Sequence, residues 1–478
     1  MVALLLRPFT MGLALSILYF VTYYLTPPTV FGPLAPYRIE LVLAVLVFFV
    51  SLPAIPKTSI LKTPQSLALI GLAVATSLSV LIGTHWLGGT LNAFLGFIPN
   101  AFAYFLVCLH CNSKKKLQVV VAMLLFVCLF VIVHGSIDLL HGVPQSGAPQ
   151  QGAEESGDQT LWNTEHPYLF AMKNDSGELI YRVRGQGLIN DPNDFGQIVV
   201  CVVPLMFIFW RAKKKLQNAA FVLLPVSVLL FGVFLTHSRG ALLALMAMAA
   251  IAVRRRIGTI PALLVAGGLF VAAMALHFTG GREISASSGS DRTVLWGEGL
   301  QMLKSHPLFG VGAGGFADNC DDCGHTAHNS IVVCAAELGL FGLYFWSLFL
   351  LPSVKDALAI ASPAKVGEGE PIVAEEGLYQ VAPRSIEALD KAEINHLGRL
   401  VLLSLTGFLV TGMFLSRAFV LTLFLLGGLA EVVYEMALRR GMVAPRMRLA
   451  PVMAYTAGLT VALVPAMYIM ILILNRMQ

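Results

Sequence analysis

Residues 182–210 read "RVRGQGLINDPNDFGQIVVCVVPLMFIFW", a polar stretch followed directly by an apolar one. Similar apolar stretches recur along the 478-residue chain, which is 57% hydrophobic and only 12% charged. Soluble domains carry about 25% charged residues. An α-helix needs about 20 apolar residues to cross the hydrocarbon core of a bilayer. The sequence therefore predicts an all-α fold, a polytopic bundle of transmembrane helices.

About thirteen spans can be counted, and we treat residues 1–478 as one polytopic membrane domain. The first span lacks a small-residue cleavage signature, so we interpret it as a retained helix rather than a signal peptide. The predicted spans lie near residues 8–25, 38–55, 65–84, 89–110, 117–138, 194–210, 217–236, 240–253, 258–278, 329–351, 397–416, 418–437 and 451–475.

Lysine and arginine residues are concentrated in alternate short loops, which assigns those loops to the cytoplasm. Two long segments, 139–193 and 279–327, then fall on the outer side, and the acidic segment 352–396 falls inside as a solvated connector. The net charge of +5 is a topology signal here and gives no indication of nucleic-acid binding. Because the polar stretch 182–197 faces outward, the sequence favours a substrate that has already been exported.

Helix capping explains one part of this polar stretch. Asp191 is a good N-cap residue, Pro192 suits the first helical position, and Asn193 and Asp194 follow in the first turn. A negative charge there also interacts favourably with the positive end of the helix dipole. Capping does not explain Arg182 and Arg184. The sequence therefore leaves two interpretations open, capping alone and capping combined with a substrate site.

The outer segments hold further polar candidates. Arg239 in "THSRG" lies at the edge of a span, where an arginine either extends to the headgroups or serves a function. In segment 279–327, Trp296, Leu300 and Leu303 follow helical spacing, which predicts a short amphipathic helix on the membrane. The "GVGAGG" at 310–315 has the spacing of a dinucleotide-binding loop but follows no strand, so we interpret it as a lid or tight turn.

His328 and Asn329 begin the next span, and Asn329 is suited to cap it. A lone histidine is commonly structural, but sidedness places His328 on the same face as Arg239 and Arg292. Cys320 and Cys323 lie in a polar outer loop, where a disulfide is plausible. Because no D-x-D or HExxH motif occurs, the sequence disfavours a metal site, and no cofactor is expected.

Taken together, "NDPNDFGQ", "SRGALLAL", "HPLFGVGAGGF" and "HNSIVVCAAELGLFG" resemble the bacterial O-antigen ligase/polymerase superfamily over roughly residues 180–352. The resemblance implies a GT-C-like bundle in the bacterial inner membrane, with its active site facing the periplasm. It also implies transfer of a glycan from an undecaprenyl-pyrophosphate carrier, without nucleotide sugar or metal. By position in the motifs, Arg239, Arg292 and His328 correspond to the family's two arginines and its histidine.

The chemistry of these side chains fits such a transfer. Arginine side chains bind phosphate oxygens, and histidine accepts a proton near neutral pH. We therefore predict His328, Arg239 and Arg292 as catalytic residues. The predicted substrate-binding residues are Arg182, Arg184, Asp191, Asn193, Asp194, Trp296, His325 and Asn329.

Several acceptors remain open at this level. Lipid A–core as acceptor defines a ligase, and the spacing of the histidine motif favours it. A lipid-linked glycan as acceptor defines a polymerase, and the two long outer segments favour that; transfer to a protein is a third possibility. A transporter or flippase for the same lipid-linked glycan is the alternative outside the enzymes. It predicts charged residues near mid-membrane and on both faces, whereas the candidates here gather at the outer edge.

Overall fold

The computed structural model describes residues 11–30, 32–58, 60–141, 166–173, 178–276, 278–280, 286–320, 326–361, 389–446 and 448–477. Ten of the described helices are long and apolar enough to cross a membrane, which confirms the predicted polytopic all-α bundle. The chain forms two compact units. Unit 1 consists of Met1–Val50, Lys115–Glu283 and Leu403–Thr411, and unit 2 of Ser51–Lys114, Ile284–Leu402 and Gly412–Gln478.

A helix occurs at each of the predicted spans, but three of these helices are not among the ten. Helices α2 (Met11–Leu25) and α13 (Thr259–Ala275) have 15 and 17 described residues. A helix of that length reaches at most about 26 Å, short of a hydrocarbon core of ~30 Å. Helix α12 (Arg239–Ile257) is longer but carries Arg239 at its start and Arg254, Arg255 and Arg256 in its last turn.

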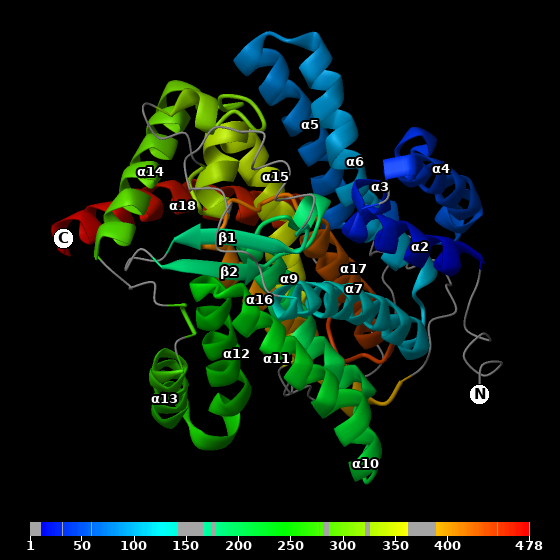
Figure 1. Cartoon of the computed structure of the whole chain (residues 1–478). Helices are drawn as coiled ribbons and strands as arrows, with labels where there is room; N and C mark the ends of the chain where they lie inside the picture. The colour runs from blue at the N-terminus through cyan, green and yellow to red at the C-terminus, as the bar shows by residue number, and fades with distance from the viewer. Residues whose placement is uncertain are drawn as a thin grey trace. The chain divides into compact units, whose positions relative to one another are not determined.

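Unit 1 combines membrane helices with a small β-hairpin that the sequence analysis did not predict. Strands β1 (Leu169–Lys173) and β2 (Leu179–Val183) pair antiparallel, with Leu169 opposite Val183. Strand β2 contacts α11 (Figure 1). The remaining elements of this unit are α3 (Pro27–Val30), η1 (Gly32–Tyr37), α4 (Ile39–Ser51), α7 (Lys114–Leu140), η4 (Gly187–Ile189), α9 (Pro192–Leu205), η5 (Met206–Phe209), α10 (Lys215–Asn218), η6 (Ala219–Leu223) and α11 (Leu224–Thr236).

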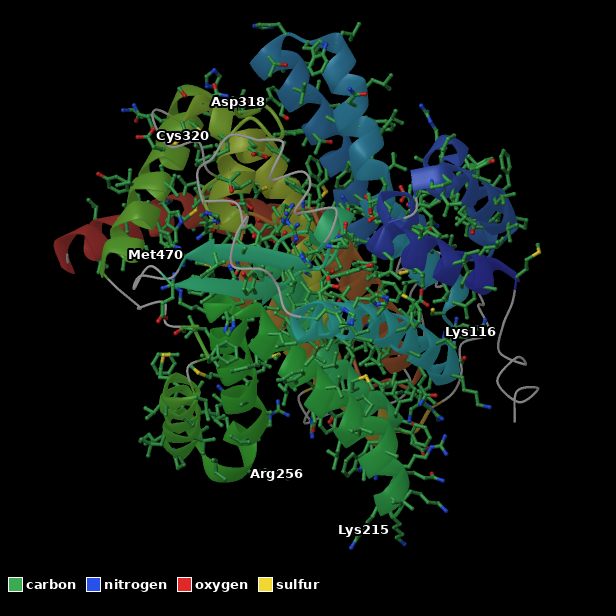
Figure 2. The ribbon with its side chains drawn as sticks, in the orientation of Figure 1. Lys116, Lys215, Arg256, Asp318, Cys320 and Met470 are labelled. Carbon is green, nitrogen blue, oxygen red and sulfur yellow. The ribbon has the colours of Figure 1, made fainter. Side chains whose placement is uncertain are left out.

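The ends of the unit 1 helices agree with the predicted loop charges. Helices α11 and α12 are joined at residues 236–239, and their other ends carry Lys215 and Arg256. Figure 2 shows Lys215 and Arg256 at the lower edge of unit 1, away from the hairpin. Within this unit, Lys215 and Arg256 therefore lie at the end opposite the turn that contains Arg239.

Unit 2 is built around helix α15 (Ser330–Ala361), which packs on α5 (Pro64–Thr84), α14 (Ala286–Ser305), α17 (Leu421–Arg439) and α18 (Leu449–Met477). The predicted amphipathic helix is α14. Its Trp296 and Leu303 are buried, and it contacts α15, so its apolar face packs on protein. Figure 2 labels Asp318 and Cys320 in the loop that follows α14. The other elements are η2 (Leu52–Lys57), η3 (Ile60–Lys62), α6 (Leu87–His110) and η7 (Ala317–Asn319). Helix α16 (Lys391–Gly412) belongs to unit 2 except for residues 403–411, which belong to unit 1.

Two boundaries in unit 2 differ from the predicted ones. Helix α15 continues through Pro352 to Ala361, beyond the predicted end at 351. Helices α16 and α17 are separated by residues 413–420, where the sequence analysis predicted two spans almost in contact. Apolar residues such as Phe419 caused that error. The Phe419 ring packs against Phe97 at 6.4 Å between ring centres, so these residues serve a turn rather than a helix.

A buried ionic cluster joins α15, α17 and the segment that follows α17. The Arg446 guanidinium donates to Asp356 Oδ2 at 2.5 Å and to Glu431 Oε2 at 2.6 Å. It also lies 3.9 Å from the centre of the Tyr434 ring. The Arg446 side chain is 13% exposed and its two partners 10% and 3%, so each charge depends on the others for its solvation.

Candidate functional site

In unit 1, the predicted cap of α9 is confirmed. Asp191 is the N-cap residue and Pro192 takes the first helical position. Asp191 Oδ1 accepts hydrogen bonds from the backbone N–H groups of Asn193 at 2.7 Å and Asp194 at 3.4 Å. One carboxylate oxygen of Asp191 therefore satisfies two N–H groups that the helix cannot pair by itself.

Arg182 lies at the end of strand β2 and is only 3% exposed. Its Nε donates to the backbone oxygen of Thr236 at 2.7 Å, and its Nη2 donates to Asn193 Oδ1 at 2.8 Å. Its Nη1 contacts Met172 Sδ at 3.7 Å. One buried guanidinium thus connects the hairpin with the C-terminus of α11 and the N-terminus of α9.

Arg184 has a more open position than Arg182. Its Nη1 lies 3.4 Å from the backbone oxygen of Asn190, and its guanidinium carbon lies 5.8 Å from the centre of the Phe170 ring. Burial lowers the pKa of Arg184 from its usual value, and nearby Asp191 opposes that shift. An arginine remains protonated after such a shift, so Arg184 is a half-buried cation beside the start of α9.

The turn between α11 and α12 presents Arg239. His237 ends α11 in the left-handed conformation, with φ of 47°, and its Nδ1 lies 2.7 Å from the backbone oxygen of Phe278. Ser238 caps α12 by accepting from the Ala241 N–H, so Arg239 is the first helical residue. A positive charge at a helix N-terminus is electrostatically unfavourable. The Arg239 charge therefore lies at the positive end of the α12 dipole.

In unit 2, helix α15 is interrupted at Gly339, which has φ of 65° and ψ of −166°. The break exposes backbone groups that the segment 307–312 pairs. Val311 N–H donates to Ala336 O at 3.0 Å, and Leu340 N–H donates to Pro307 O at 2.8 Å. Irregular backbone at membrane depth is tolerated where protein covers it. The two quoted motifs "HPLFGVGAGGF" and "HNSIVVCAAELGLFG" thus form one structural element.

The glycines in this element are required for close backbone approach. A Cβ on Gly339 would lie 2.4 Å from the backbone oxygen of Leu308, and one on Gly310 would lie 2.3 Å from the Glu337 carbonyl. Gly314 N–H donates to Glu337 Oε2 at 2.9 Å, so the loop 310–315 is held to α15 by both main chain and side chain. This geometry agrees with the tight-turn interpretation of "GVGAGG".

His328 directly precedes this broken helix. It is exposed and has a left-handed backbone, with φ of 49°. Its N–H donates to Ser416 Oγ at 2.8 Å. Asn329 Oδ1 accepts from the N–H groups of Ile331 at 3.0 Å and Val332 at 3.3 Å, which confirms the predicted cap.

Two residues of α14 are connected to the same region. The Trp296 ring is buried, and its Nε1–H donates to the backbone oxygen of Ala327 at 2.9 Å, next to His328. The Arg292 guanidinium carbon lies 5.4 Å from the centre of the Phe414 ring. The structure therefore brings Arg292 and His328 to one short segment, residues 413–420.

Arg417 in this segment is a candidate that the sequence analysis missed. Its backbone N–H donates to Ser330 Oγ at 3.2 Å. The signal was present in the sequence, because Ser416–Arg417 repeats the Ser238–Arg239 pair in a loop predicted to be outer, where basic residues are otherwise scarce. The predicted span boundaries at 416 and 418 left Arg417 without consideration.

The remaining predictions concern a disulfide, a metal site and His325. Cys320 is disulfide-bonded, whereas Cys323 and the predicted substrate-binding residue His325 lie outside the described residues. Within the described residues, no group of three or more histidine, cysteine, aspartate or glutamate side chains could hold a metal ion.

Comparison with known families gives one match. Residues 224–347 match the family model described as O-antigen ligase, which confirms the predicted resemblance. The matched range contains Arg239, Arg292 and His328, and it ends shortly after the break at Gly339. No curated protein matches the chain.

Proposed function

The chain is O-antigen ligase-like through residues 224–347, and on that basis we propose that it transfers a glycan from an undecaprenyl-pyrophosphate carrier to an acceptor hydroxyl. The reaction takes place at the periplasmic face of the bacterial inner membrane. The preferred acceptor in this proposal is lipid A–core, which makes the enzyme a ligase of lipopolysaccharide biosynthesis.

The proposed reaction is a direct displacement at the anomeric carbon. The acceptor oxygen forms a bond to that carbon while the carbon–oxygen bond to the pyrophosphate breaks. His328 accepts the proton of the acceptor hydroxyl, and undecaprenyl pyrophosphate leaves as an anion. Arg239 and Arg292 bind the phosphate oxygens and neutralise the charge that develops on them. A single displacement inverts the anomeric configuration.

The observation that carries this proposal is the convergence of Arg292 and His328 on residues 413–420 of unit 2. Arg292 lies over Phe414, and the His328 backbone is bound to Ser416. An arginine side chain and the backbone of a histidine thus contact the same short segment. Chemistry of this type needs both groups within reach of the same substrate.

Two cations of unit 1 are also assigned to substrate binding in this proposal. Arg239 contributes a cation at the N-terminus of α12, and Arg184 contributes a half-buried one beside α9. Arg182 is proposed as a positioning residue, because its guanidinium is already bound to Thr236 and Asn193. Asp191 acts as a helix cap in this proposal, since its Oδ1 accepts two backbone N–H groups.

A polymerase is the second candidate. It uses the same donor but extends another lipid-linked glycan, and the two long outer segments of the sequence favour it. The experiment that separates the candidates is reconstitution of the purified protein in vesicles with lipid-linked glycan and lipid A–core. Glycan on lipid A–core supports the ligase, and a chain-lengthened carrier supports the polymerase. Movement of carrier across the bilayer without transfer would contradict both and favour a transporter.

Variants of the three predicted catalytic residues complete the test. His328→Ala, Arg239→Ala and Arg292→Ala are each expected to lower transfer by two orders of magnitude or more, on the order of what single groups contribute to acid–base and electrostatic catalysis. Lys304→Ala, at an exposed position on α14, is the matched control. Full transfer by His328→Ala would overturn the assignment of His328 as the base.

A further inference from the structure

We propose that Arg417 binds the pyrophosphate of the lipid-linked donor, together with Arg292 and beside His328. The inference rests on the proposed function and adds one residue that neither the predicted site nor the matched range 224–347 contains. It assigns the segment between α16 and α17 a direct part in substrate binding.

The first support is the attachment of this segment to the start of α15. Three hydrogen bonds connect the two: His328 N–H donates to Ser416 Oγ at 2.8 Å, Ser330 Oγ–H donates to Leu415 O at 2.8 Å, and Arg417 N–H donates to Ser330 Oγ at 3.2 Å. The Arg417 backbone is therefore bonded directly to the Ser330 hydroxyl group. The Arg417 side chain is half-buried, and Arg417 follows Ser416, whose Oγ accepts from the His328 N–H.

The second support is that the same segment contacts Arg292. Phe414 lies under the Arg292 guanidinium, with 5.4 Å between the guanidinium carbon and the ring centre. At this distance the guanidinium is attracted electrostatically to the face of the ring. Residues 414, 416 and 417 thus belong to one turn that contacts Arg292, holds the His328 backbone and presents a second arginine.

The third support concerns which groups are available to bind an anion. The first N–H groups of α15 are already paired, because Asn329 Oδ1 accepts from Ile331 and Val332. The helix terminus is thereby satisfied without a ligand. Binding of a pyrophosphate in this region must therefore rely on side chains, and guanidinium groups match the geometry of phosphate oxygens in two parallel hydrogen bonds.

The fourth support is the cost of an arginine at this position. The predicted topology places Arg417 on the outer face, whereas basic residues concentrate in the inner loops. An arginine at the end of an apolar span either extends to the headgroups or serves a function, and this proposal assigns Arg417 a function.

The bonds that hold the turn use the main chain of residue 417 and the hydroxyls of Ser330 and Ser416. Replacement of the Arg417 side chain therefore leaves these three bonds in place. Arg417→Ala removes both the positive charge and the hydrogen-bond donors of the side chain. Arg417→Lys retains the charge but cannot donate two parallel hydrogen bonds to one phosphate group. Lys304→Ala, exposed on α14, is the matched control.

The test measures binding of inorganic pyrophosphate to the purified full-length protein in nanodiscs, by calorimetry, beside transfer kinetics and thermal unfolding. Arg417→Ala is expected to weaken pyrophosphate binding by a factor on the order of 10, to raise KM for the donor similarly and to leave the unfolding temperature near that of wild type. The pyrophosphate affinity and KM of Arg417→Lys are expected to lie between those of Arg417→Ala and wild type. Lys304→Ala is expected to match wild type in both.

Two results would overturn the inference. One is unchanged pyrophosphate affinity in Arg417→Ala while Arg292→Ala loses it. The other is a lower unfolding temperature in Arg417→Ala together with a fall in kcat and an unchanged KM. That result would assign Arg417 a structural role. Failure of the proposed function gives a different pattern, because wild-type protein would then neither transfer glycan nor bind pyrophosphate.

Discussion

Arg182 Nε donates to the backbone oxygen of Thr236 at 2.7 Å, across 54 residues of sequence. This bond ties strand β2 to the last residue of α11, three residues before Arg239. The carbonyl groups at a helix C-terminus lack partners within the helix and carry partial negative charge. A buried guanidinium satisfies such a carbonyl, so Arg182 holds the turn that precedes Arg239.

Arg182→Ala is therefore expected to lower both stability and transfer. The variant leaves Thr236 O and Asn193 Oδ1 without this donor, and hydrogen bonds to charged groups contribute about 1.5–3 kcal/mol each. Thermal unfolding in detergent and transfer kinetics measure the two effects. Arg211→Ala, at an exposed position, is the control. Wild-type stability combined with weaker donor binding would instead support direct substrate contact by Arg182.

Gly339→Ala is expected to destabilise unit 2. The φ of 65° and ψ of −166° lie in a region that only glycine adopts readily, at a cost of about 1–3 kcal/mol for other residues. The added Cβ would also lie 2.4 Å from Leu308 O. The comparison is Gly458→Ala in α18, where a Cβ meets no atom within 4 Å. Equal unfolding temperatures for the two variants would show that the break in α15 is not required.

Arg446→Met is expected to lower the free energy of unfolding by about 3–5 kcal/mol, because it leaves the Asp356 and Glu431 carboxylates buried without their cation. Adding Asp356→Asn and Glu431→Gln to this variant removes both charges and should recover most of the loss. Chemical denaturation in detergent micelles provides the measurement, with the exposed Arg439→Met as control. A triple variant no more stable than Arg446→Met would contradict the role of charge in this cluster.

Trp296→Phe tests the connection between α14 and the residue before His328. The substitution keeps a buried aromatic ring but removes the Nε1–H that donates to Ala327 O at 2.9 Å. Loss of this donor should lower kcat more than it raises KM, because it loosens the backbone that carries His328. Trp210→Phe, at a 44% exposed position, is the matched control. An increase in KM alone would identify Trp296 as a substrate contact.

Transfer is expected to continue in excess EDTA. In the proposed mechanism, arginine side chains rather than a divalent cation neutralise the leaving pyrophosphate. The assay compares initial rates in vesicles before and after chelation, with and without added Mg²⁺ or Mn²⁺. Loss of activity that either ion restores would contradict this part of the mechanism.

Some features of this protein depend only on neighbouring residues, and the sequence alone was sufficient for them. Apolar runs predicted the helices, because burial in a bilayer requires length and hydrophobicity that can be counted locally. Asp191–Pro192 and Asn329 predicted two helix caps, since a cap pairs with N–H groups two or three residues away.

The tertiary structure decided the features that depend on distant main chain. Arg182 was predicted as a substrate contact, but its observed partners Asn193 and Thr236 lie 11 and 54 residues away. The break at Gly339 exists because residues 307–312 supply the missing hydrogen bonds, and apolar Phe419 concealed the turn that holds Arg417. Hydropathy and capping signals extend over one or two helical turns, whereas these contacts require the chain to be folded before the partners meet.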